Sequence, residues 1–249
     1  MIGFLSETKS IKICVNVKAM VDELEDSSRA PVDIMVVMDR SGSMRHGKLR
    51  DCKQTLETVC SHLTARDRLG LVSFSGTATL EVPTRHMTPG NKETLKRKAN
   101  AIRAGGLTNL SGGLSLAAME MARTPKPNQI RSIFLLTDGF ATAGIHKTLD
   151  LVTMVRNLNP EELPAIDEME IGESQAASTQ ASSTPAESSR DSIPDGIVVK
   201  HGKPPISLFC FGYGSNHDSQ MLQEISDATP GGAYYFVEKD SDVAPAFGK

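Results

Sequence analysis

The sequence predicts an α/β fold in which a doubly wound, mostly parallel central sheet carries helices on both of its faces. Three apolar segments, residues 32–38, 130–137 and 206–211, indicate strands that are buried on both sides. Each is followed by apolar residues at three- and four-residue steps, which is the pattern of an amphipathic helix. Strands that alternate with helices favour parallel pairing, with the helices returning over both faces of the sheet.

The segment after the first buried strand predicts a helix and then a hairpin. Apolar residues at helical spacing span roughly residues 48–63. Residues 68–75 and 77–82 indicate two strands that are joined by a turn at Gly76.

Further helices follow from the same periodicity. One contains Leu95, Ala99 and Ile102 and ends at a glycine pair, and the next begins after Thr108 and Asn109, both suited to a helix N-cap. Later helices are indicated by two groups of apolar residues: Leu149, Val152, Val155 and Leu158; and Met221, Leu222 and Ile225. A last strand is expected at residues 233–237.

Composition suggests where the domain begins and where it is interrupted. Residues 1–30 combine one alternating segment, an expected edge strand, with a polar linker, and residues 31–249 form one domain. Within that domain, residues 160–205 are rich in Ser, Thr, Ala, Pro and acidic residues. We expect this insertion to be disordered, because it has too few apolar side chains to offset the entropy of ordering.

Charge and cysteine content exclude several classes of function. A net charge of −3 does not indicate binding to nucleic acid or to an anionic membrane surface. The four cysteines form no Cys-x-x-Cys pair, so a zinc site is not expected. No secretory signal and no apolar run of about 18 residues is visible, which favours an intracellular location, cytoplasmic or otherwise.

Oxygen-bearing side chains follow the buried strands at the edge where a doubly wound sheet binds its ligands. Asp39, Ser41 and Ser43 come at alternating positions directly after the first strand, and Asp138 follows the second. Thr108, at the start of a helix, is expected at the same edge. Carboxylates and hydroxyls are hard oxygen ligands, so the strand ends predict a site for Mg²⁺ or a similar cation.

Asp-x-Ser-x-Ser after a hydrophobic strand resembles the von Willebrand factor type A domain, a Rossmann-like fold. The resemblance extends over most of the chain. Similar domains occur in ubiquitin-ligase-like and inter-alpha-trypsin-inhibitor-like proteins, and one alternative is that the chain is the type A domain of a larger ubiquitin-ligase-like protein. It implies a metal-ion-dependent adhesion site for Mg²⁺ or Mn²⁺ that is formed by Asp39, Ser41, Ser43, Thr108 and Asp138. A protein partner would supply an Asp or Glu at the open coordination position. It also implies a final helix, of which residues 241–249 are only the beginning, so we expect the chain to be a fragment.

Other interpretations of the same residues remain. Ser, Gly and Asp after a strand are also common turn and cap residues. A Mg²⁺-dependent phosphohydrolase is the main enzymatic alternative, although Ser41 stands where an aspartyl phosphatase needs a second acid. His46 near the two serines suggests a hydrolase only superficially, because no Gly-x-Ser-x-Gly motif is present. Gly212 and Gly214 begin a dinucleotide-type loop whose third glycine is absent.

Overall fold

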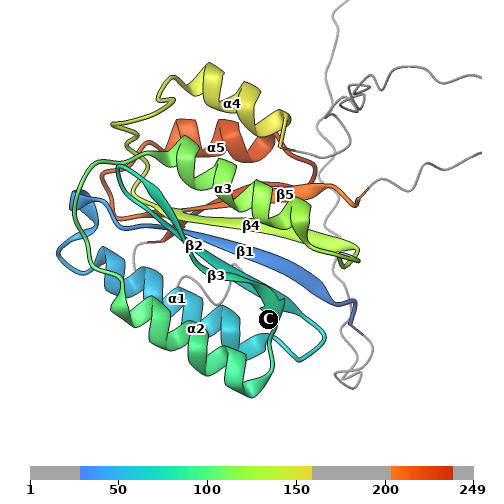
Figure 1. Cartoon of the computed structure of the whole chain (residues 1–249). Helices are drawn as coiled ribbons and strands as arrows, with labels where there is room; N and C mark the ends of the chain where they lie inside the picture. Colours follow the sequence, from blue (N-terminus) through green and yellow to red (C-terminus); the bar gives the residue numbers. More distant parts are fainter. Residues whose placement is uncertain (1–28, 159–202, 238–249) are drawn as a thin grey trace, which may run out of the picture. The chain divides into compact units, whose positions relative to one another are not determined.

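The computed structural model describes residues 29–158 and 203–237, and in these the chain forms one sheet flanked by helices (Figure 1). The sheet has the strand order β3-β2-β1-β4-β5-β6. Its strands are β1 (Val32–Asp39), β2 (Arg68–Phe74), β3 (Ala78–His86), β4 (Ile130–Thr137), β5 (Ile206–Tyr213) and β6 (Ala233–Val237). The helices are α1 (Lys48–His62), α2 (Pro89–Ala101), α3 (Leu110–Arg123), α4 (Thr148–Arg156) and α5 (Ser219–Asp227).

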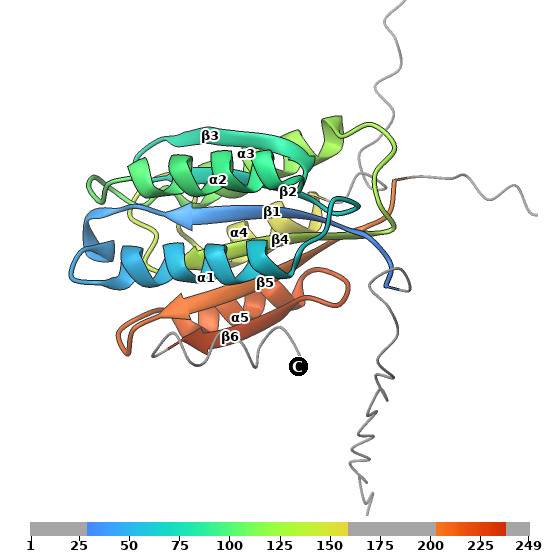
Figure 2. The same ribbon diagram turned by 90° about the horizontal axis from the view of Figure 1, so that it is seen from below.

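The predicted fold class is confirmed. All neighbouring strands pair in parallel except β2 and β3, which form the antiparallel hairpin. Helices α1 and α2 cover one face, and α3, α4 and α5 cover the other (Figures 1 and 2). Alternate residues of β1 explain why its sequence is apolar throughout: Val36 packs on the α1 side, while Met35 and Val37 pack on the α3 side.

Three details of the predicted elements are corrected by the structure. Helix α2 ends at Ala101, with Ile102 as its C-cap, and so stops before the expected glycine pair. Strand β3 continues to His86 and passes through Pro83, beyond the expected end at residue 82. Because β3 is an edge strand, the missing N–H of this proline costs the sheet little. In α4, Leu149 points into solvent, and Leu151 takes the buried position beside Val152 and Val155.

The order of the strands determines where a ligand site can form. Strand β1 pairs with β2 on one side and with β4 on the other. From β1 the sheet is extended first toward β2 and β3 and then, from β4 onward, in the opposite direction, so the strand order reverses between β1 and β4. Doubly wound sheets bind ligands in the crevice at the carboxyl ends of the strands at such a reversal. Asp39 ends β1 and Asp138 directly follows β4, so both predicted ligands lie at the carboxyl edge of the sheet, on the two strands that flank this reversal.

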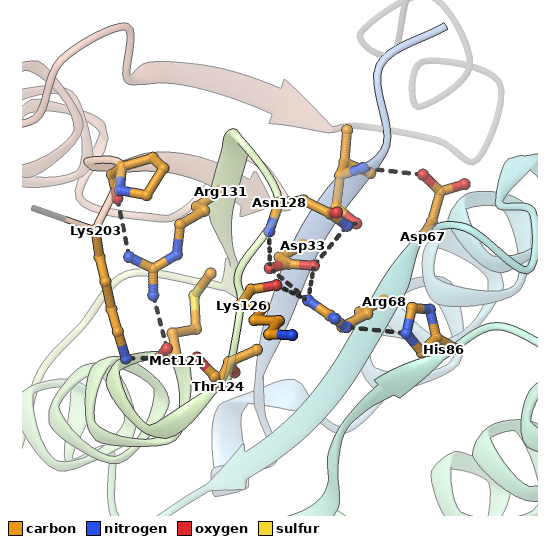
Figure 3. A network of polar contacts seen from close by, with 12 residues as sticks. Asp33, Asp67, Arg68, His86, Met121, Thr124, Lys126, Asn128, Arg131 and Lys203 are labelled. Atoms are coloured by element: carbon orange, nitrogen blue, oxygen red, sulfur yellow. Dashed lines mark hydrogen bonds and ion pairs between the residues drawn. The ribbon is translucent and has the colours of Figure 1, made fainter. Parts of the chain in front are cut away.

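The opposite edge of the sheet holds a polar network that explains the one charged residue in the apolar run of β1 (Figure 3). Asp33 is buried, and its carboxylate accepts hydrogen bonds from the backbone N–H and the side-chain Nδ2 of Asn128, each at 2.8 Å. The guanidinium of Arg68 lies 3.4 Å from the same carboxylate. Asp33 therefore fastens the amino end of β1 to the loop before β4 and to β2.

Several predictions concern residues outside the described part of the chain. These are the edge strand and linker of residues 1–30, apart from the described residues 29 and 30; the insertion at 160–205, apart from the described residues 203–205; and the final helix at 241–249. Among the described residues, no helix has both the length and the apolar character that crossing a lipid bilayer requires.

Candidate metal-binding site

The turn after β1 holds three of the predicted ligands in a compact arrangement. The backbone N–H of Ser41 donates to Oδ1 of Asp39 at 2.7 Å, which folds the chain back at the end of the strand. A short 3₁₀ turn over Gly42–Met44 then brings the hydroxyls of Ser41 and Ser43 to 3.0 Å from each other. Alternate spacing along the sequence thus places all three side chains in one turn.

The loop after β4 joins this turn through side chains. The hydroxyl of Ser43 donates to Oδ1 of Asp138 at 3.0 Å, although 95 residues separate the two in sequence. The other oxygen of Asp138, Oδ2, accepts from the ammonium of Lys48 at 2.9 Å. Ser41, Ser43 and Asp138 therefore form one continuous hydrogen-bonded chain of oxygen atoms.

The loop that carries Thr108 is held against the same turn by its backbone. The N–H of Gly42 donates to the carbonyl of Gly106 at 2.9 Å, and the N–H of Gly105 donates to the carbonyl of Arg40 at 2.7 Å. Thr108 itself is buried, and its N–H donates to the hydroxyl of Thr142 at 2.9 Å. The sequence predicts both Thr108 and Asn109 as possible N-caps of α3. Asn109 is the N-cap, so the Thr108 side chain does not cap the helix.

Asp39 is fully buried, and its surroundings favour a positive charge beside it. The hydroxyl of Thr137 donates to Oδ2 of Asp39 at 2.6 Å, across the gap between β1 and β4. The pKa of Asp39 is raised from 3.8 to about 6: burial is the largest cause, the hydrogen bonds from Thr137 and Ser41 oppose it, and the nearby Asp138 carboxylate adds to the increase. A cation beside Asp39 would lower the free-energy cost of burying this carboxylate.

The residues at this edge fit a hard divalent cation. The donors are carboxylate and hydroxyl oxygens, which suit Mg²⁺ or Mn²⁺ better than a soft metal. The ammonium of Lys48 lies 2.9 Å from Oδ2 of Asp138, so a positive charge is already accommodated beside this carboxylate. The described residues contain no group of three or more His, Cys, Asp or Glu side chains arranged for a metal, and the described cysteines Cys52, Cys60 and Cys210 are buried free thiols.

Two residues of the site were not foreseen from the sequence. Lys48 begins α1 and pairs with Asp138 across 90 residues, and Thr137 reaches Asp39 across 98 residues. Thr137 immediately precedes Asp138, so its place at the end of a buried strand was the available signal. Lys48 carried no comparable signal, because nothing in a helical pattern shows which side chain meets a neighbouring loop.

The rival interpretations find little support in the geometry. His46 is exposed, with a positive φ of 60°. In the loop after Gly212, ring atom Nδ1 of His217 lies 2.6 Å from the carbonyl of Gly214. The N-cap of the following helix is Asp218, whose carboxylate accepts from the N–H of Met221 at 3.0 Å. A carboxylate at that helix start repels the phosphate that a dinucleotide loop would bind there.

Comparison with known proteins supports the same family. The model of the von Willebrand factor type A domain matches residues 33–247. Inter-alpha-trypsin inhibitor heavy chain H4 from Sus scrofa is 34% identical over 225 residues, which cover 87% of this chain and 19% of that protein. E3 ubiquitin-protein ligase WAV3 from Arabidopsis thaliana is 34% identical over 117 residues, or 47% of this chain and 16% of the ligase. The chain thus spans less than a fifth of either relative.

Solved structures share the fold at low sequence identity. A von Willebrand factor type A protein from Catenulispora acidiphila has a TM-score of 0.61 and 17% identity, covering 88% of this chain and 41% of that chain. Proximal thread matrix protein 1 from the mussel byssus, described with a zinc-occupied adhesion motif, has a TM-score of 0.55 and 15% identity, covering 87% of this chain and 46% of that chain. Domains of this family commonly mediate protein–protein interactions. With its sheet order and with a family match over most of its length, the chain belongs to the von Willebrand factor type A domain family.

Proposed function

We propose that this domain is a divalent-cation-dependent protein-interaction module. In this proposal Ser41, Ser43 and Thr108 offer hydroxyl oxygens to Mg²⁺ or Mn²⁺, and Asp39 and Asp138 bind the ion directly or through water. An Asp or Glu side chain of a partner protein completes the coordination. Carboxylates are few in this set and hydroxyls are neutral, so the bound ion stays strongly attractive to an incoming carboxylate.

One observation carries the proposal. The hydroxyl of Ser43 lies 3.0 Å from the Ser41 hydroxyl and 3.0 Å from Oδ1 of Asp138, which joins the turn after β1 to the end of β4. Three oxygen donors from two distant segments therefore already lie within contact of one another. Such prior assembly lowers the entropic cost of binding an ion, because the ligands need little further ordering.

The identity of the ion is part of the proposal. Hydroxyl and carboxylate oxygens favour Mg²⁺ or Mn²⁺. The zinc described in the mussel byssus protein supports the view that domains of this fold hold a divalent ion at the adhesion motif. We therefore expect Mn²⁺ to substitute for Mg²⁺, and Zn²⁺ to compete with both.

We propose no catalytic activity for the site. Ser41 occupies the place where a phosphatase of the aspartyl type needs an acid to protonate the leaving group. The two relatives are a ubiquitin ligase and an inhibitor heavy chain, and this chain covers less than a fifth of either. We therefore assign neither protein's activity to this chain. Magnesium-dependent turnover of p-nitrophenyl phosphate that is lost in Asp39→Asn would contradict this view.

A metal titration with matched variants tests the proposal. Binding of Mg²⁺ to the folded protein alone is expected to stabilise it by about 2.7 kcal/mol at a concentration of ~100 Kd. The variants Ser43→Ala and Asp138→Asn are expected to lose most of this gain in a thermal melt and most of the heat in calorimetry. Asp150→Asn is the control, because it makes the same chemical change at an exposed position of α4. Equal Mg²⁺-induced shifts in all four proteins would reject the site.

A further inference from the structure

We infer that the metal site lies within a docking surface for a short, extended protein segment in which bulky apolar residues flank a central acidic residue. The inference rests on the proposed function, because the acidic residue is the one that meets the ion. It adds the class of partner sequence and the residues of this chain that select it. The apolar contribution is separable from the metal and is tested separately below.

Large apolar side chains are exposed in the two loops that border the site. Leu107, directly before Thr108, is 58% exposed; Phe140, two residues after Asp138, is 44% exposed; and Ile145, in the same loop as Phe140, is 37% exposed. We call Leu107, Phe140 and Ile145 the apolar rim. Single exposed apolar residues are ordinary on protein surfaces. Here, however, three of them lie in the two loops that carry Thr108 and Asp138, which is the observation from which we infer an interaction.

The backbone that carries the apolar rim is firmly held. The carbonyl of Thr108 accepts hydrogen bonds from the N–H groups of Thr142 and Ala143, at 2.9 and 3.1 Å, which ties the two loops together. The N–H of Ile145 donates to the hydroxyl of Ser111 at 3.0 Å. The rim is therefore displayed on ordered loops, so a partner that covers it does not have to pay for ordering them.

Gly144 fixes the same loop against the start of α3. Its φ is +69°, and a Cβ added there would lie 2.2 Å from Oδ1 of Asn109, the N-cap of that helix. The loop thus packs so closely that only glycine fits. Because this close packing holds the loop in one conformation, Phe140 and Ile145 are exposed by the fold of the loop itself.

Charge at this edge selects an acidic partner independently of the metal. The described loops at the carboxyl ends of the strands contain Arg40, Arg45, Arg103 and Lys147. Their acidic residues are Asp138, which is paired with Lys48, and Asp218, which caps α5. The excess of positive charge attracts an acidic segment and disfavours a basic one.

The positions of the rim residues suggest how the segment lies. Leu107 and Phe140 come from separate loops, one leading to Thr108 and one leading away from Asp138, so each of the two loops that carry these proposed ligands exposes an apolar side chain. An extended segment advances about 3.3 Å per residue, so side chains one or two positions from its acidic residue can reach these neighbouring surfaces. The occupant we commit to is therefore such a segment of a partner protein.

A peptide selection on the whole chain tests this inference. The probe is a library of twelve-residue peptides with one fixed central Asp and all other positions random, screened in 1 mM MgCl₂ and in EDTA. We expect the retained peptides to be enriched in Leu, Ile, Phe or Met within two positions of the Asp. We expect their affinity to fall about tenfold in Leu107→Ser and in Phe140→Ser, since each removes part of a buried apolar contact.

Matched variants separate apolar docking from damage to the fold. Met119→Ser is the control, because Met119 is 50% exposed on α3 and lies outside the apolar rim. Phe140→Leu keeps an apolar side chain and should retain most of the affinity. All variants should keep the Mg²⁺-induced rise in Tm of the unaltered protein, because none of them removes a proposed ligand.

The possible outcomes distinguish this inference from the proposed function. Retained peptides without apolar preference, whose Mg²⁺-dependent affinity is unchanged in Leu107→Ser and Phe140→Ser, would overturn the docking surface and leave the metal-dependent function intact. Apolar enrichment that persists in EDTA and is lost in Phe140→Ser would support the surface while contradicting metal dependence. Concentration-dependent dimerisation that these two variants abolish would show that a second copy of the chain is the occupant, which would overturn the peptide proposal.

Discussion

The Nζ atom of Lys48 lies 2.9 Å from Oδ2 of Asp138, so the first residue of α1 provides a counter-charge to the carboxylate that follows β4. The Lys48 side chain is partly exposed, whereas that of Asp138 is buried. A divalent ion in the proposed site needs the same carboxylate. Lys48 and the ion are therefore expected to compete for Asp138.

The first prediction follows from this competition. Lys48→Met is expected to raise the affinity for Mg²⁺ about fivefold, the equivalent of ~1 kcal/mol for a partly exposed ion pair. Calorimetric titration measures it, with Lys126→Met as a control for loss of one positive charge in the loop between α3 and β4. An unchanged or weaker affinity in Lys48→Met would show that the ammonium helps to hold the site and does not compete for it.

The second prediction concerns the network at the amino end of β1 (Figure 3). The Nδ2 group of Asn128 donates to Asp33 at 2.8 Å and to the carbonyl of Val32 at 3.2 Å. Asn128→Ala removes these donors from a buried carboxylate and is expected to lower the free energy of unfolding by about 1–3 kcal/mol. Urea unfolding measures the change.

Its control uses the same substitution at a hydrogen bond that is exposed to solvent. Asn91 donates one hydrogen bond to the carbonyl of His86 at 2.8 Å in an exposed region, so Asn91→Ala should cost much less. Neither variant should alter Mg²⁺ affinity, since Asp33 and Asp39 lie at opposite ends of β1. A large change in Mg²⁺ affinity in Asn128→Ala would contradict the view that this network is only structural.

The third prediction tests the close contact between α3 and the sheet. A Cβ added to Gly113 would lie 2.9 Å from Cδ1 of Phe74 and 3.1 Å from a methyl carbon of Val37. Gly113→Ala therefore overpacks the core and is expected to destabilise the protein by about 1–3 kcal/mol. Thermal or urea unfolding measures the effect.

Gly90 provides the comparison, because it lies in α2 and an added Cβ would meet nothing within 4 Å. Alanine favours a helix over glycine, so Gly90→Ala should be neutral or stabilising by up to about 1 kcal/mol. If Gly113→Ala were equally neutral, α3 would have room to move away from β1 and β2.

Local pattern determined much of this protein. The apolar segments that became β1, β4 and β5 lie where the periodicity indicated, and the acids at the ends of β1 and β4 fixed which edge of the sheet carries the candidate ligands. These features depend on neighbours in sequence: a strand buried on both faces needs an unbroken apolar run, and a parallel strand delivers its last residue to the carboxyl edge.

Tertiary structure alone decided the contacts between distant segments. No periodicity shows that Lys48 will meet Asp138, that Thr137 will reach Asp39, or that Asn128 will hold Asp33 across 95 residues. It also decided that Leu151, and not Leu149, faces the core, because both belong to an apolar stretch and only the packing of α4 on the sheet distinguishes them. Pairings of this kind depend on which strands become neighbours, and that choice is made by the assembly of the whole sheet.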